Sequence, residues 1–526
     1  MSEKTQGRTA KSLMNSMSSC LSYLILMVST FVTRAVFKRY LGLDYSGVET
    51  VFLNIITMLA IVELGIGSGV VYKLYKPIAD KDYRKIAILI NFYKKAYRII
   101  ASILAALGIG MAFFAPSFIK SDEGFEYWWL VVIFILYVCD TLASYLYANR
   151  RAMFTADQRN YVSVNVHTAC QIVVGIAQIA VLILCTEAVG KAVALLIYLI
   201  IRIAGRLAEN IIIAVQYNRR YGKEIDLKIK ESLPDHEQRD LMKNIKALLM
   251  HKIAGQSLTS TASVIVSAFV NTTIAGIYGN YTLITTALKT LSDYFFNGIA
   301  ASFGNLLSTS TKESVIKNYN KIYLLNFFLS SFFAISFFNV AQPFVSIWIG
   351  KNDLLDVSTV LLISVYLYMM TMRHSVFMAR SSAGQYQQDR WFALLEAVIN
   401  LGAALILVHP LGINGVIIAN IVSLVAIPFW TQPRIVYHDV LGIKVRNYYK
   451  KYGVFFAVSA VYTAVIYGLR LLLQTGNAFI DLLISMALCV VIINGANILI
   501  FRRTDEYSQL REMALDMLRK LRKKKA

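Results

Sequence analysis

Long hydrophobic runs alternate with short polar segments along almost the whole chain. Each run is close to the 20 or so residues that a helix needs to cross roughly 30 Å of hydrocarbon, and such windows predict about fourteen membrane-spanning helices. The predicted spans are 13–33, 48–72, 97–116, 127–148, 161–185, 190–216, 247–271, 279–303, 322–348, 356–378, 391–409, 412–433, 452–473 and 477–501. The pattern therefore predicts an all-α membrane protein.

The polar segments between these runs distribute their basic residues unevenly. With the N-terminus in the cytoplasm, most of the 53 Lys and Arg residues fall in cytoplasmic segments, and the bias alternates at every connection except the first. A missed single helix would reverse the bias downstream, so the alternation favours an even number of spans with both termini in the cytoplasm. The net charge of +22 follows mainly from this topology, and we expect no nucleic-acid partner.

The composition agrees with a membrane location. Hydrophobic residues make up 57% of the chain and charged residues 16%, whereas soluble proteins have about 45–50% and about 25%. The run 13–33 is too long for the apolar part of a secretion signal and is predicted to be a retained span. The five cysteines lie in apolar runs and are interpreted as packing residues.

The longest polar connection, 218–246, is the natural border between two halves. Tyr45 and Gly65 precede Tyr278 and Gly298 by the same number of positions, which is consistent with a duplicated helical bundle. The predicted domains are a six-helix lobe (1–225), a second six-helix lobe (226–440), two further helices (441–501) and a basic cytoplasmic tail (502–526). Residues 502–525 are predicted to form either an amphipathic helix on anionic lipid headgroups or a solvated tail.

Ionisable residues in or beside the spans are the site candidates, because a charge at the bilayer centre costs about 2.5–3.5 kcal/mol. Arg34, Lys38 and Arg39 follow the first span at its outer end, where few cations are expected. Arg34 and Lys38 share one face if the helix continues that far. These cations could bind a pyrophosphate in a cavity, or they could extend toward outer headgroups.

Other charges have the same two interpretations, structural pairing or function. Lys289 and Asp293 are spaced to neutralise each other on one helix, and Arg202, Arg206 and Glu209 form a similar group. Four further residues are lone candidates: Arg373, His374, Glu63 and Asp140. Lys289 and Arg373 join the cationic substrate-binding set, whereas Glu63, Asp140 and Asp293 are candidates for ion pairing or for binding a coupling proton.

No motif in the sequence predicts catalysis. Asp80 and Asp82 flank a lysine in a basic loop without partner carboxylates, the six histidines lack His-Glu-x-x-His spacing, and there is no Walker loop. We therefore expect a protein that is not an enzyme and has no cofactor or metal.

Short motifs along most of the chain resemble the Wzx-type polysaccharide repeat-unit flippases, a branch of the superfamily that also holds the MATE exporters and the lipid II flippase. The motifs are Arg34 with Tyr40-Leu41-Gly42-Leu43 and Gly47; Glu63-Leu64-Gly65-Ile66-Gly67; Gly276-Ile277-Tyr278-Gly279-Asn280-Tyr281; Ser302-Phe303-Gly304-Asn305; Pro343-Phe344 with Trp348-Ile349-Gly350; and Gly384, Asp389-Arg390, Glu396, Asn400 and Leu411-Gly412-Ile413-Asn414-Gly415. One departure is the segment 253–270, which has no charge where some relatives have several.

The resemblance implies a MATE-like fold of two pseudo-symmetric six-helix bundles plus two C-terminal helices. It also implies alternating access of a cationic cavity, in a bacterial cytoplasmic membrane, to undecaprenyl-pyrophosphate-linked oligosaccharide repeats. Membrane lipids, and a polysaccharide polymerase or glycosyltransferases, are the implied partners. The alternatives are a cation-coupled multidrug exporter and a membrane glycosyltransferase or polymerase.

Overall fold

The protein is all-helical, as the hydrophobic pattern predicts. A computed structural model describes residues 3–60, 66–229, 231–235, 237–239, 260–385 and 390–525, and every regular element in these ranges is a helix. Helices suit a lipid environment because each one satisfies its own backbone hydrogen bonds. Two compact units account for most internal contacts: the N-terminal unit, Met1–Gly276, and the C-terminal unit, Ile277–Ala526. The domain division predicted from sequence remains a prediction.

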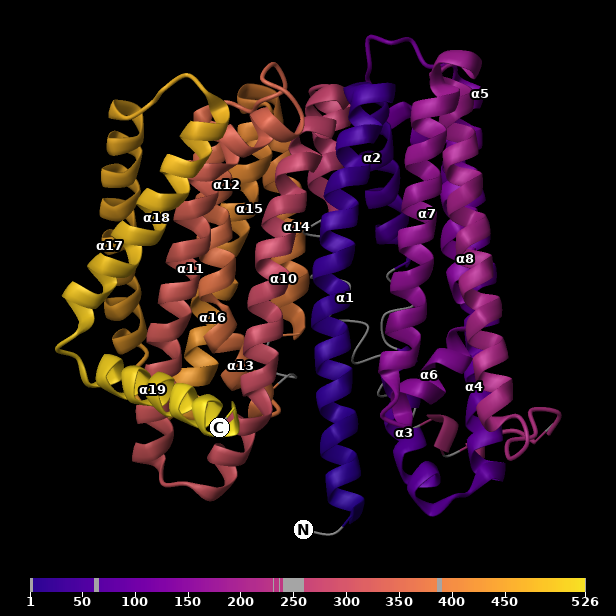
Figure 1. Cartoon of the computed structure of the whole chain (residues 1–526), viewed down its shortest axis with the longest axis horizontal. Helices are drawn as coiled ribbons and strands as arrows, with labels where there is room; N and C mark the ends of the chain where they lie inside the picture. The colour runs from indigo at the N-terminus through magenta and orange to yellow at the C-terminus, as the bar shows by residue number, and fades with distance from the viewer. Residues whose placement is uncertain are drawn as a thin grey trace. The chain divides into compact units, whose positions relative to one another are not determined.

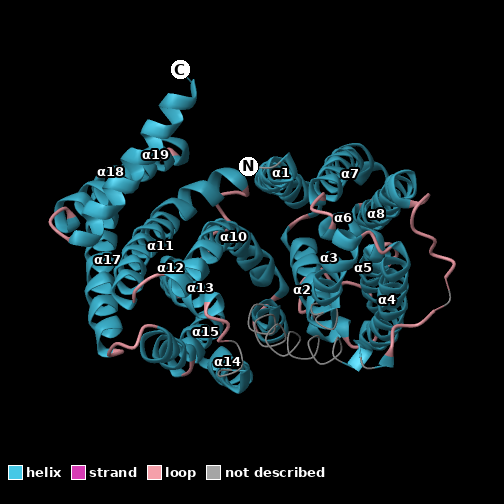
Figure 2. Cartoon of the chain, turned by 90° about the horizontal axis from the view of Figure 1, so that it is seen from below, coloured by secondary structure: helices cyan, strands magenta, loops and turns pink. Residues whose placement is uncertain are grey.

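The N-terminal unit contains eight α-helices that lie wholly inside it. They are α1 (Glu3–Leu41), α2 (Leu43–Leu59), α3 (Ile66–Asp80), α4 (Tyr83–Ala112), α5 (Tyr127–Tyr145), α6 (Ala148–Ala156), α7 (Asn160–Val189) and α8 (Lys191–Tyr221), with a short 3-10 helix at Ala115–Phe118. Helices α1, α7 and α8 lie side by side (Figure 1, Figure 2), and α5 packs on both α4 and α8. An aromatic core fills the end of this unit where α3, α4, α6 and α8 meet, and Tyr93, Tyr97 and Tyr217 belong to it.

The C-terminal unit contains most of α10 and all later helices. They are α10 (Thr272–Thr309), α11 (Lys312–Trp348), α12 (Val357–Met372), α13 (His374–Ser382), α14 (Arg390–Leu411), α15 (Ile413–Ala426), α16 (Pro428–Arg434), a π-helical turn (Ile435–Val440), α17 (Arg446–Leu472), α18 (Ala478–Phe501) and α19 (Asp505–Lys525). Helix α11 is central, since α12, α17 and α18 all pack on it. Tyr323 and Phe327 on α11 stack on Tyr448 and Phe455 of α17.

Ten helical segments in the described part of the chain are long and apolar enough to cross a membrane, which indicates a multi-pass membrane protein. They are Met17–Leu41, Tyr83–Ala112, Tyr127–Tyr145, Asn160–Val189, Lys312–Trp348, Val357–Ser382, Trp391–Leu411, Ile413–Val440, Arg446–Leu472 and Ala478–Phe501. The prediction of about fourteen is compatible with this number. Helix α8 is long enough but is not among the ten, and it contains the charged residues Arg202, Arg206 and Glu209.

Several predicted spans have different ends or contain breaks. The first helix continues beyond 33 to Leu41. The predicted span 356–378 is interrupted at Arg373, between α12 and α13. The predicted span 412–433 breaks at Ile427, because Pro428 lacks the N–H that would continue the α15 ladder. Hydrophobicity alone locates apolar runs but not these breaks.

The basic C-terminal segment forms the predicted helix, α19. It runs across the direction of α11 (Figure 1), with Leu510 and Phe501 buried in one cluster with residues of α11 and α17. Lys451 on α17 donates a 3.0 Å hydrogen bond to Glu506. The N-terminal half of α19 is therefore docked on the C-terminal unit.

Candidate functional site

A buried arginine lies near the C-terminal end of α1. Arg34 is 8% exposed, and its guanidinium lies 2.7 Å from the Glu49 carboxylate on α2. Its second amino group donates to the Thr50 hydroxyl at 3.0 Å and to the carbonyl oxygens of Ser46 and Gly276 at 3.3 and 3.5 Å. Arg34 therefore joins α1 to α2 and to the first turn of α10.

The hairpin between α1 and α2 explains why Arg34 meets Glu49. Gly42 forms the turn with a φ of 101°, which a residue without Cβ adopts at little cost. Arg34 and Glu49 lie almost equally far from Gly42 along the chain, so the antiparallel helices place them opposite each other. Sequence analysis missed Glu49, and this spacing is the signal that could have found it.

The other two cations of the predicted cluster have different environments. Helix α1 extends to Leu41, so Arg34 and Lys38 do share a helical face. Lys38 is half-buried and Arg39 is exposed. Their role in binding an anionic substrate remains a prediction.

A close crossing of two backbones holds the Gly276 carbonyl near Arg34. A Cβ added to Gly47 of α2 would lie 2.1 Å from the Thr272 carbonyl oxygen, and one added to Gly276 would lie 2.8 Å from the Gly47 nitrogen. The Thr273 hydroxyl donates a 2.8 Å hydrogen bond to Asp44 at the start of α2. The first turn of α10 therefore packs directly on α2, with no room for side chains between them.

A second group of charges connects α5, α6, α7 and α8. Asp140 on α5 accepts a 2.9 Å hydrogen bond from Arg202 and lies 3.5 Å from Arg206, both on α8. Arg206 also lies 3.5 Å from Glu209. The interpretation of Asp140 as a lone carboxylate is therefore wrong, because two guanidinium groups from a neighbouring helix neutralise it.

Glu209 is the most enclosed carboxylate of this group. Its side chain is 1% exposed, and it lies 2.9 Å from Arg151 on α6 and 3.1 Å from the His167 Nδ1 atom on α7. Arg151 also donates a 2.8 Å hydrogen bond to Asn210. Arg151 and His167 were not singled out in the sequence, because partners from separate helices leave no local spacing signal.

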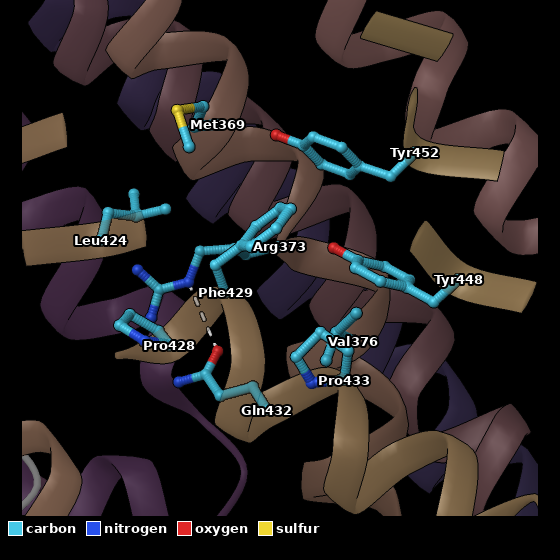
Figure 3. A pocket seen from close by; sticks show the side chains of 10 residues that line it. All are labelled: Met369, Arg373, Val376, Leu424, Pro428, Phe429, Gln432, Pro433, Tyr448 and Tyr452. Atoms are coloured by element: carbon cyan, nitrogen blue, oxygen red, sulfur yellow. Dashed lines mark hydrogen bonds between the residues drawn. The ribbon is translucent and has the colours of Figure 1, made fainter. Parts of the chain in front are cut away.

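In the C-terminal unit, Arg373 lines a pocket together with aromatic residues. Its guanidinium donates a 3.3 Å hydrogen bond to Gln432, and Tyr448 and Tyr452 extend from α17 toward it (Figure 3). Glu396 on α14 lies 3.6 Å away, so the ion pair has no hydrogen bond of ordinary length. Arg373 therefore also has a partner, although a loosely held one.

His374, the residue after Arg373, contacts a carboxylate on α10. Its Nε2 atom lies 2.7 Å from Asp293, and its ring stacks on Phe296 with a centroid separation of 5.6 Å. Among the ion pairs of the described residues none joins Asp293 to Lys289, so the predicted pairing of these two is wrong. The free energy of contact with a second helix outweighs the short i,i+4 reach along α10.

The remaining predicted candidate, Glu63, lies outside the described residues. Within those residues no group of three or more His, Cys, Asp or Glu side chains could hold a metal ion. The described site chemistry consists of guanidinium groups that can bind an anion and of carboxylate and imidazole groups that can bind a proton.

The sequence matches no known protein-family model and no curated protein. Solved structures do match the fold. The lipid II flippase MurJ in an inward closed conformation aligns with a TM-score of 0.64 and 14% identity over 93% of this chain and 99% of its own.

Two multidrug transporters align over less of the chain. An inward-facing MATE transporter of the MOP superfamily aligns with a TM-score of 0.61 and 14% identity, over 80% of this chain and 98% of its own. The Vibrio cholerae MATE transporter VcmN gives 0.55 and 12%, over 84% and 100%. The chain therefore has the fold that these membrane transporters share.

Proposed function

We propose that the protein is a flippase that moves undecaprenyl-pyrophosphate-linked oligosaccharides across a bacterial cytoplasmic membrane by alternating access. In this proposal both termini are cytoplasmic. The substrate would come from membrane glycosyltransferases and pass to a polysaccharide polymerase. The shared fold with a lipid II flippase supports a lipid-linked substrate, and the sequence motifs support an oligosaccharide on that lipid.

The share of the chain that aligns favours a flippase over a drug exporter. The lipid II flippase aligns with 93% of this chain, whereas the two MATE transporters align with 80% and 84% although nearly all of their own length is used. The additional part is comparable in size to the segment that begins with α17. A flippase of lipid-linked sugars therefore accounts for more of this chain.

The observation that carries the proposal is Arg34, a buried guanidinium in an apolar helix. Guanidinium groups bind phosphate oxygens through paired hydrogen bonds. In the described conformation Glu49 occupies one edge of this group at 2.7 Å. We infer that the pyrophosphate of the substrate replaces the Glu49 carboxylate during transport, so that the guanidinium never stands unpaired in the membrane.

The test is a flipping assay with purified protein in liposomes that contain undecaprenyl-pyrophosphate-linked oligosaccharide. Wild-type protein should move the lipid between leaflets, and Arg34→Gln/Glu49→Gln should abolish movement while the protein remains folded. The double variant removes both charges, so a defect cannot come from a stranded carboxylate. Arg39→Gln, which alters an exposed cation of the same helix, is the matched control. Normal flipping by the double variant would refute the role of Arg34.

A cation-coupled multidrug exporter is the second candidate. The MATE folds support it, and so do the membrane carboxylates Asp140, Glu209 and Asp293. Ethidium efflux from a pump-deficient host distinguishes the two functions. Efflux without flipping would favour the exporter, whereas flipping without efflux would favour the flippase. Transfer of labelled sugar by the purified protein would instead revive the alternative of a membrane glycosyltransferase.

A further inference from the structure

His374 begins α13 at the interruption between α12 and α13, and both of its ring nitrogens face hydrogen-bond acceptors. The Nδ1 atom lies 2.8 Å from the backbone carbonyl oxygen of Thr371, with the Ser292 hydroxyl at 3.3 Å. The Nε2 atom lies 2.7 Å from Oδ1 of Asp293. The side chain of His374 is 8% exposed, whereas that of Asp293 is 45% exposed. The ring is enclosed, but its carboxylate partner reaches solvent or a lipid-accessible space.

These contacts determine how many protons the pair must hold. A carbonyl oxygen only accepts, so the Nδ1 atom carries a hydrogen toward Thr371. The 2.7 Å contact then needs a second proton, either on Nε2 as an imidazolium or on the Asp293 carboxyl. Without it, two lone pairs would face each other at hydrogen-bond distance. The described contact therefore exists only when the pair binds one proton more than a neutral histidine and an ionised aspartate.

The surrounding charges leave this pair distinct from the neighbouring ones. On α10 the nearest cation along the helix is Lys289, one turn before Asp293, and it has no ion-pair partner among the described residues. Arg373 is engaged by Glu396 of α14. The other titratable groups on the helices packed against α13 are buried phenols, the buried Arg380 of α13 itself, and exposed groups: Tyr319 and Tyr323 on α11, Tyr368 on α12, Tyr437 on the π-helical turn, and the exposed Arg434, His438 and Asp439.

We propose that His374 and Asp293 form a one-proton binding site that fastens α10 to the start of α13. When the proton leaves to water, His374 becomes neutral, Asp293 stays ionised, and the 2.7 Å contact is lost. The released carboxylate then pairs with Lys289 one turn away on α10, the position that its i,i+4 spacing allows. Proton binding thus moves Asp293 between a partner on another helix and a partner on its own helix.

The site gives the proposed flippase a coupling ion. This role rests on the proposed function, whereas the binding of the proton does not. Helix α10 runs from residue 272, whose carbonyl meets Gly47 of α2, to residue 309. A proton that fastens or frees one helix of this length can alter the transport cycle through contacts at both of its ends.

The direct test is nuclear magnetic resonance of protein labelled with ¹⁵N in its six histidines. The signal that disappears in His374→Gln is that of His374. We expect its ring nitrogens to pass through one protonation step as the pH is raised, and we expect Asp293→Asn and Lys289→Gln each to displace that step. His438→Gln is the matched control, since His438 also contacts a carboxylate at 2.6 Å but is 79% exposed. It should leave the His374 signal unchanged.

Three results would overturn the proposal. His374 signals that stay constant over the pH range in which the protein is folded would exclude a titrating proton. A step that is identical in Asp293→Asn would show that the aspartate takes no part. A step unchanged in Lys289→Gln would exclude Lys289 as the destination of the carboxylate.

Transport is measured separately so that the two proposals can fail independently. In the flipping assay, His374→Gln should lose the dependence of flipping on pH, whereas His438→Gln should keep it. A titrating His374 in a protein that flips no lipid would refute the proposed function and leave the proton site intact. A wild-type pH dependence that His374→Gln fully retains would refute the coupling role.

Discussion

The two units treat their buried charges differently. In the N-terminal unit, Asp140 and Glu209 have side chains 6% and 1% exposed, and each is surrounded by two or more cationic groups. In the C-terminal unit, Asp293 is 45% exposed and relies on one histidine. A guanidinium keeps its charge at any physiological pH, whereas an imidazole does not. The first arrangement is therefore a permanent tie between helices, and the second is one that a proton can undo.

The largest effect expected from this difference is that of removing Asp140. Asp140→Ala would leave Arg202 and Arg206 facing each other in an apolar environment, and breaking a buried pair in this way costs about 3–5 kcal/mol. We expect a corresponding loss in the free energy of unfolding, measured in mixed detergent micelles. Asp439→Ala, at a 36% exposed carboxylate of the C-terminal unit, is the control. Equal losses in the two variants would remove the distinction between permanent and proton-dependent ties.

The pair of Arg34 and Glu49 tests whether the ties in the N-terminal unit act by charge balance. Arg34→Gln strands a buried carboxylate and should lower the free energy of unfolding by about 3 kcal/mol. Arg34→Gln/Glu49→Gln should recover more than half of that loss, because two uncharged amides can hydrogen-bond to each other. A double-mutant cycle measures the coupling. Additive losses would show that the two residues stabilise the protein independently.

The crossing of α2 and α10 tests whether packing fixes the N-terminal unit as firmly as charge does. Gly47→Ala places a Cβ against a backbone carbonyl, which cannot move as a flexible side chain can, and overpacking of this kind costs about 1–3 kcal/mol. Gly110→Ala on α4 is the matched control, because no atom lies within 4 Å of its added Cβ. Thermal unfolding of the two variants should separate them. A Gly47→Ala variant as stable as the control would mean that the helices move apart easily.

The sequence predicts the scaffold of both units better than their sites, for a physical reason. Membrane helices are long and apolar, so α5, α7 and α18 begin and end within a few residues of their predicted limits. Breaks are less visible. Only Pro428 announces one, and the interruption at Arg373 has no proline or glycine to signal it.

Candidate charges are also found by sequence, but their partners are not. Arg34, Asp140 and Asp293 stand out because charge is rare in apolar runs. Their partners Glu49 and His374 lie on other helices, so only the folded chain brings them together. The i,i+4 rule, which sees one helix at a time, therefore assigned Asp293 to Lys289. A pairing rule for residues equidistant from a tight turn would have found Glu49.

The smallest expected effect concerns an exposed ion pair at α19, which lies outside both kinds of buried tie. Partial burial raises the pKa of the Glu506 carboxyl, but the hydrogen bond and charge of Lys451 lower it by more in total, so the net pKa lies below its ordinary value. The pair therefore stabilises the folded protein at neutral pH, and this contribution disappears as the pH falls through the lowered pKa. Because Lys451 is 37% exposed, solvent screening limits the contribution to about 0.2–1 kcal/mol.

Glu506→Gln should lower the melting temperature slightly at pH 7, relative to Glu512→Gln, which alters an exposed carboxylate of the same helix. The difference between Glu506→Gln and the wild type should vanish in acid, because the wild-type carboxyl is then protonated as well. A loss as large as that of Asp140→Ala would mean that docking of α19 depends on this one contact rather than on the burial of Leu510 and Phe501. A difference that grows in acid would reverse the sign of the pKa shift and so exclude Lys451 as its cause.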